Sequence, residues 1–146
     1  PYDPGRARRL LAEAGYPDGF ALTAEIQINA IPADSLIYQS VAHYLRQVGV
    51  ELTLRVIPFP QYLKKLATNG WTVEAFGATW NSAPYNDATR PMETFSCRRP
   101  RPFFCDEPLA EALGRASRIA DPAARLVAMR ELARGYHEAA PALFLV

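Results

Sequence analysis

The residues best suited to chemistry gather in a polar segment that follows an apolar run. The run is Val73 to Thr79, and its length and lack of proline are typical of a buried strand. Side chains that could hold a small solute come next, namely Trp80, Asn81, Tyr85, Asn86 and Asp87. An aromatic ring offers apolar surface and amides offer hydrogen bonds, which is the usual make-up of a ligand pocket. The alternative is a core tryptophan followed by an ordinary connection.

The rest of the sequence shows few residue patterns that are typical of a catalytic site. His43 and His137 both fall in expected helices, away from any glycine-flanked serine, so a nucleophile beside a base is missing. The glycines stand singly at expected helix ends and turns, and no phosphate-binding loop emerges. We therefore expect no catalytic residue and no cofactor. An enzyme domain built on Asp87, Arg90 and Tyr85 remains an alternative.

The cysteines Cys97 and Cys105 are separated by seven residues and have no histidine nearby. This is not the spacing of a zinc site, so no metal is expected. The spacing leaves open a disulfide that closes a short loop, in an oxidising compartment, or two free thiols in a reducing cell.

Arginines cluster in the same part of the chain, at Arg90, Arg98, Arg99 and Arg101. They could bind an anion or dock a protein partner, or they could simply be solvated. The net charge of the chain is +1, from 16 basic and 15 acidic residues, so nucleic acid is not an expected partner.

Helices and strands are expected to alternate in the first half of the chain. Helical patterns span residues 3–15, 34–48 and 59–68, and strand patterns span residues 20–28, 50–57 and 73–79. This order predicts an α/β fold with parallel strands and right-handed crossovers. Ligands of such folds bind beyond the carboxyl ends of the strands, which is where Trp80 and Asn81 fall.

The second half of the chain lacks this alternation of helices and strands. Residues 82–106 form a long irregular segment of a kind that is often functional, and two helices should follow, one of them opened by Asp121 and Pro122. Ala142 to Val146 is expected to be a last buried strand. The 146 residues are 49% hydrophobic and 21% charged, as in a single globular domain without a membrane span. Because the chain begins with Pro1, we expect it to be a piece of a longer protein.

The amino end carries a distinctive motif, Tyr2-Asp3-Pro4 followed by LLAEAGYPDGF from Leu10 to Phe20. It closely resembles a motif of the family 5 extracellular solute-binding proteins, the dipeptide, oligopeptide and nickel receptors of ABC importers. Further signals follow in the order of that family, namely LRQVGV from Leu45 to Val50, Tyr62-Leu63, Trp80, Phe104-Cys105-Asp106, Asp121 with Arg125, and Ala140-Pro141-Ala142.

The resemblance implies a periplasmic-binding-protein-like fold of type II, with a mixed sheet flanked by helices. Residues 1–146 would be the core of the carboxyl-terminal lobe. The whole receptor would be periplasmic or extracellular, free or lipid-anchored, and would have no enzyme activity. Its partners would be a small-molecule or peptide solute, its own first lobe and an ABC permease. Because members of the family are exported, the resemblance also implies a disulfide between Cys97 and Cys105.

Peptide-binding members of the family carry a tryptophan at the position of Trp80. An aspartate three residues later pairs with the amino group of their peptide, and here that position is Ala83. Asp87 lies four residues further on and could replace it only in a rearranged loop. The resemblance therefore supports a binding role and leaves the solute undetermined.

Overall fold

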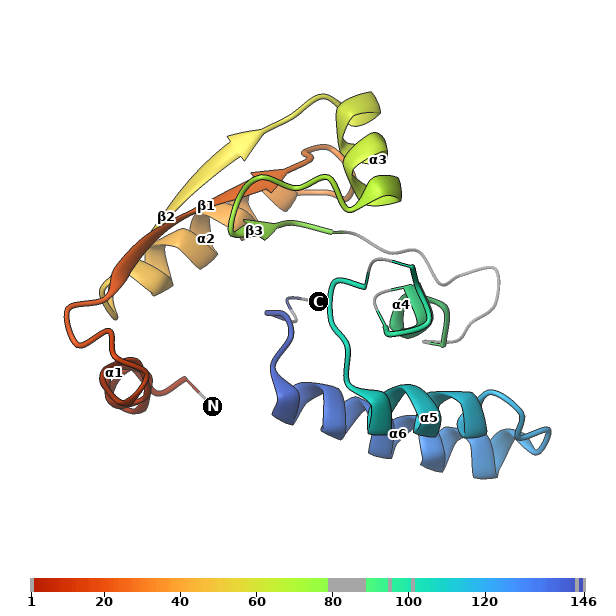
Figure 1. The fold of residues 1–146 in the computed structure, drawn as a ribbon. Helices are drawn as coiled ribbons and strands as arrows, with labels where there is room; N and C mark the ends of the chain where they lie inside the picture. The colour runs from red at the N-terminus through yellow and green to blue at the C-terminus, as the bar shows by residue number, and fades with distance from the viewer. Residues whose placement is uncertain (1, 79–88, 95, 101, 144, 146) are drawn as a thin grey trace. The chain divides into compact units, whose positions relative to one another are not determined.

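A computed structural model describes residues 2–78, 89–94, 96–100, 102–143 and 145. The chain forms two compact units, Pro1–Thr79 and Trp80–Val146, called here the first and second unit. Figure 1 labels the helices and strands of each.

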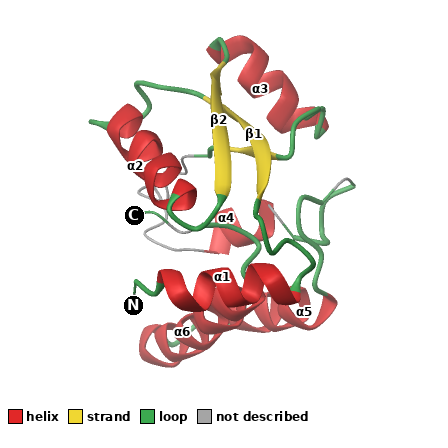
Figure 2. Ribbon diagram, turned by 90° about the vertical axis from the view of Figure 1, so that its left-hand side faces the viewer, coloured by secondary structure: helices red, strands yellow, loops and turns green. Residues whose placement is uncertain are grey.

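The first unit alternates helices and strands in the order that the sequence predicts. Its elements are α1 (Pro4–Glu13), β1 (Phe20–Ile26), α2 (Asp34–Arg46), β2 (Val50–Val56), α3 (Phe59–Thr68) and β3 (Ala75–Phe76). The strands form a parallel sheet in the order β2-β1-β3, and Figure 2 shows α2 and α3 on either side of the strands. The α/β class is confirmed, and the sheet is parallel rather than mixed in the part of the chain that the structure describes.

Two glycines bring the first strands together at their starts. Gly19 and Gly49 have φ angles of 78° and 91°, in the left-handed region that favours glycine. A side chain on Gly19 would collide with the backbone of Gly49, and the Phe20 N–H donates to the Gly49 carbonyl at 3.2 Å. The glycines of the YPDGF and LRQVGV motifs therefore meet, which explains why both segments need glycine there.

Helix α1 begins as its sequence predicts, because the Asp3 carboxylate accepts from the Arg6 N–H at 2.8 Å. Gln47, the residue that follows α2, accepts through its side chain from the Tyr2 hydroxyl and through its carbonyl from Arg8 of α1 at 2.7 Å. The apolar stripe of α1 is not buried, and Leu10 remains 51% exposed.

The second unit is helical in its described residues. It contains α4 (Thr89–Thr94), α5 (Glu107–Ala116) and α6 (Pro122–Ala139). Asp106 and Asp121 cap the longer helices by accepting from the Leu109 N–H at 2.9 Å and the Ala124 N–H at 2.7 Å. Side by side, α5 and α6 bury a core of Leu113, Ala116, Leu132 and Tyr136.

Three expectations need correction. Over the described residues 73–78 the expected strand is confined to β3, and the segment 82–106 contains the short helix α4. The strand expected at Ala142 to Val146 is wrong for the described residues 142, 143 and 145, and Leu143 is 65% exposed. A strand needs a neighbour for its backbone groups, and the described part of the second unit has no other strand.

Candidate functional site

The residues predicted to bind a ligand, Trp80, Asn81, Tyr85, Asn86 and Asp87, lie outside the described residues. The structure does describe β3, Gly77 and Ala78, which lead to them. The site can therefore be built up to the point where the chain leaves the sheet.

That exit point lies at the carboxyl edge of the sheet. All three strands are parallel, so their carboxyl ends share one edge. Just beyond the strands, the Gly77 N–H donates to the Glu25 carbonyl at 2.9 Å, and the Ile57 N–H donates to the Ile26 carbonyl at 3.0 Å. Ligands of α/β sheets bind outside this edge.

A buried carboxylate ties the sheet to α3 near this edge. Glu25 is 1% exposed, although it is charged and alternates along β1 with the apolar residues Ala24 and Ile26. It accepts from the Lys65 ammonium of α3 at 2.6 Å and from the Arg55 guanidinium, which lies opposite it on β2. Lys65 lowers the pKa of Glu25 most, burial acts to raise it, and Arg55 adds to the lowering.

An aromatic cluster holds β3 on the same face. The Trp71 ring stacks on the Phe76 ring, with centroids 4.3 Å apart and planes 7° apart. Tyr62 of α3 meets Trp71 edge-on at 5.7 Å, and the Lys65 ammonium lies 5.7 Å from the Trp71 centroid. The buried Trp71 Nε1 has no acceptor among the described residues. Together with Glu25, this cluster fixes the position of Phe76.

Asp34 organises the loop that follows β1. Its side chain is 5% exposed and accepts from the Ala30 N–H at 2.8 Å and the Ile31 N–H at 3.4 Å. Burial acts to raise the pKa of Asp34, but backbone N–H groups, Ala30 first, lower it overall. Helix α2 follows Ala33, which has a φ of 61° and makes no side-chain cap.

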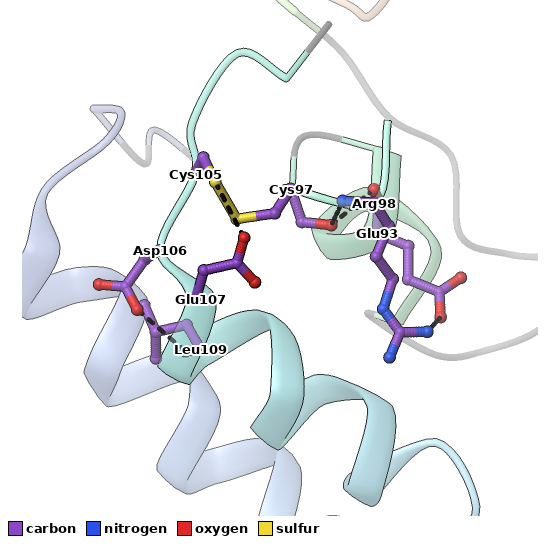
Figure 3. The surroundings of a disulfide bond; sticks show 8 residues. Glu93, Cys97, Arg98, Cys105, Asp106, Glu107 and Leu109 are labelled. Atoms are coloured by element: carbon purple, nitrogen blue, oxygen red, sulfur yellow. Dashed lines mark hydrogen bonds and ion pairs between the residues drawn. A yellow bond between two sulfur atoms is a disulfide. The ribbon is translucent and has the colours of Figure 1, made fainter. Parts of the chain in front are cut away.

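The disulfide between Cys97 and Cys105 is present in the second unit, with Cα atoms 4.5 Å apart, as expected (Figure 3). Glu107 extends a carboxylate oxygen to 3.8 Å from the Cys105 sulfur. These side chains bring three ligand-type atoms within 4.8 Å of one another. The sulfurs are bonded to each other, so neither can act as a thiolate ligand for a metal.

The described arginines of the basic segment pack within the second unit. Arg98 lies 3.9 Å from Glu93 and covers Gly114, where an added Cβ would lie 3.1 Å from the Arg98 guanidinium carbon. The guanidinium of Arg99 lies 5.4 Å from the Phe103 ring centroid. This packing does not favour the alternative in which the segment is a free basic patch for a partner.

Residues 1–101 match the family model of bacterial extracellular solute-binding proteins, family 5 Middle. Glutathione-binding protein GsiB of Pectobacterium atrosepticum is 27% identical over 158 residues, covering 99% of this chain and 30% of its own length. GsiB of Salmonella typhimurium is 31% identical over 96 residues, covering 58% of this chain and 19% of its own length. The chain thus spans less than a third of these relatives.

Solved structures show the same fold. The periplasmic binding protein DppA of Helicobacter pylori, in complex with the peptide STSA, has a TM-score of 0.79 at 22% identity, covering 99% of this chain and 28% of that one. A periplasmic oligopeptide-binding protein of Borrelia burgdorferi has a TM-score of 0.81 at 18% identity, covering 99% and 29%.

These relatives are solute-binding proteins and not enzymes, so the enzyme alternative is not favoured. Among the described helices, none has the length and apolar character that crossing a membrane requires. The match covers more than half of the residues and begins with the motif at the amino end. The chain belongs to the bacterial extracellular solute-binding proteins of family 5.

Proposed function

We propose that this chain is the core of the carboxyl-terminal lobe of a receptor that delivers a peptide-like solute to an ABC permease. The observation that carries the proposal is the match of residues 1–101 to the family. The coverage supports a lobe, because 99% of this chain overlays on 28% of a peptide-bound receptor. In this proposal both units belong to one lobe, and a first lobe closes over the solute.

The relatives support the solute class. One group is named for glutathione, a modified tripeptide, and one structure holds the peptide STSA. Ala83 stands where the resemblance places an amine-anchoring aspartate. We therefore propose a peptide-like solute whose amino group is not anchored at position 83, and glutathione is the first candidate.

The binding residues that we propose are Trp80, Asn81, Tyr85, Asn86 and Asp87. They follow the point where the chain leaves the carboxyl edge of the sheet, and the Glu25 and Trp71 contacts hold that point. An exported location fits the disulfide, which persists in oxidising compartments. A lipid anchor outside this segment would keep such a receptor near its permease.

A thermal-shift screen on the whole receptor tests the proposal. Glutathione and short peptides should raise the melting temperature, because a ligand that binds only the folded state stabilises it. Sugars, opines and metal chelates serve as competing classes, and Trp80→Ala is the variant that should lose the shift. Stabilisation by one of those classes, with none from peptides or glutathione, would overturn the peptide-like solute.

A further inference from the structure

A tyrosine from α2 takes the space where a side chain at position 77 would lie. A Cβ built on Gly77 would come within 2.7 Å of Cζ and 2.8 Å of Cε1 of Tyr38, and closer still to its hydroxyl. Gly77 does not have a positive φ angle, so the backbone conformation does not require glycine. Glycine is needed at this position because the Tyr38 phenol fills the space.

The phenol lies at the edge where ligands of such sheets bind. Successive strand residues point to opposite faces, and Phe76 points to the face of Glu25 and α3. Position 77 therefore points to the other face, where α2 supplies Tyr38. Gly77 is the first residue after β3, so the Tyr38 hydroxyl lies at the carboxyl end of that strand.

The Tyr38 hydroxyl has hydrogen-bonding capacity that the described residues leave unused. Tyr38 is half-buried, and its oxygen makes no hydrogen bond to any residue that the structure describes. Burial raises the pKa of Tyr38, and the charge of Asp34 raises it further, so the group remains an O–H donor at neutral pH. A hydroxyl donor without a partner among the described residues is available to a ligand at this edge.

We propose that Tyr38 is a solute-binding residue whose hydroxyl donates a hydrogen bond to an oxygen of the solute. In a peptide-like solute the acceptor is a carbonyl or carboxylate oxygen, and Gly77 is the position that gives the phenol access to it. This inference rests on the proposed function. It adds a residue from α2 to a site that the sequence places only in the loop after β3.

The test uses the whole receptor and calorimetry, with reduced glutathione and trialanine as probes. Tyr38→Phe removes one oxygen and keeps the ring that packs on Gly77. It should weaken binding of the better probe about tenfold, the scale of one lost hydrogen bond from a partly buried group. Tyr44→Phe is the matched control, because Tyr44 is on the same helix, is 54% exposed and packs on Tyr2. It should leave the affinity unchanged.

Gly77→Ala provides a second test of the inference, because its methyl group must displace the Tyr38 phenol. It should also weaken binding, and adding Tyr38→Phe should cause no further loss. Melting curves of every variant show whether the fold is kept.

If Tyr38→Phe binds like the wild type, or if Tyr44→Phe loses as much affinity, the inference is wrong and the proposed function stands. If the wild-type receptor binds neither probe and is stabilised instead by a sugar, an opine or a metal chelate, both are overturned.

Discussion

Replacing Glu25 by glutamine is the sharpest test of what holds the candidate site in place. The change keeps the shape of the side chain and removes its charge. It leaves the Lys65 side chain, 13% exposed, and the Arg55 side chain, 51% exposed, without their counter-charge. Breaking a buried ion pair from one side costs about 3–5 kcal/mol.

At this site we expect a somewhat smaller loss of stability than that range. Half of the Arg55 side chain is in solvent, so its share resembles a surface pair of about 0–1 kcal/mol. The glutamine amide also keeps one oxygen that can accept from Lys65. We therefore expect Glu25→Gln to lower the free energy of unfolding of the first unit by about 2–4 kcal/mol at neutral pH.

The effect should depend on pH with a defined sign. The pKa of Glu25 is lowered from its usual 4.5 in the folded state, first by Lys65. A depressed acid contributes stability above its unfolded pKa, and this is lost as pH falls through the folded pKa. The wild type should therefore lose its advantage over Glu25→Gln as the pH falls below about 4.5, the usual value for glutamate.

Urea unfolding followed by tryptophan fluorescence measures this difference. The chain has two tryptophans, so a Trp80→Phe background leaves Trp71, which stacks on Phe76, as the reporter of the first unit. Glu51→Gln, at an exposed position on β2, is the control. The reasoning is refuted if both variants change stability equally, or if the loss in Glu25→Gln is the same at pH 3 and pH 7.

Other predictions test the site and the second unit. Trp80→Ala in the whole receptor should weaken solute binding by about 1–3 kcal/mol and leave the melting curve unchanged. A loss of about 3–5 kcal/mol of stability would instead indicate that the Trp80 ring is part of the core. By calorimetry, this chain alone should bind glutathione weakly or not at all, because closure of two lobes supplies much of the contact; equal affinity for the chain and the receptor would contradict this. Replacing Cys97 and Cys105 by serine should lower the stability of the second unit by about 2–3 kcal/mol, as loop-closure entropy predicts for a short loop, and urea curves with and without reductant check it. Gly77→Ala should destabilise the first unit by about 1–3 kcal/mol through overpacking, and adding Tyr38→Ala should recover part of the loss.

Much of the fold could be predicted because its signals are local. Asp3 with Pro4 and Asp121 with Pro122 cap helices through hydrogen bonds that reach three residues along the chain. Apolar spacing then gave the type and order of every long element. The short helix α4 was missed, because six residues leave too little room for a helical period to show.

Glu25 shows why the buried network could not be predicted. Its alternation with apolar neighbours places it on the polar face of β1, which is correct. What buries that face is α3, and the partners of Glu25 are 30 and 40 residues away in sequence. The pairing register that sets Arg55 opposite Glu25 follows from the meeting of Gly19 and Gly49, which no single segment reveals.

The same limit applies to Tyr38, which falls in the expected helix 34–48 and carries no local sign of a binding role. Strand β3 has only two residues, so its ladder with β1 is too short to hold it alone. Side chains hold it instead, with Trp71 stacked on Phe76 from one face and Tyr38 against Gly77 from the other. These contacts, which come from α2 and from Trp71 before β3, fix where the chain leaves the sheet at Gly77.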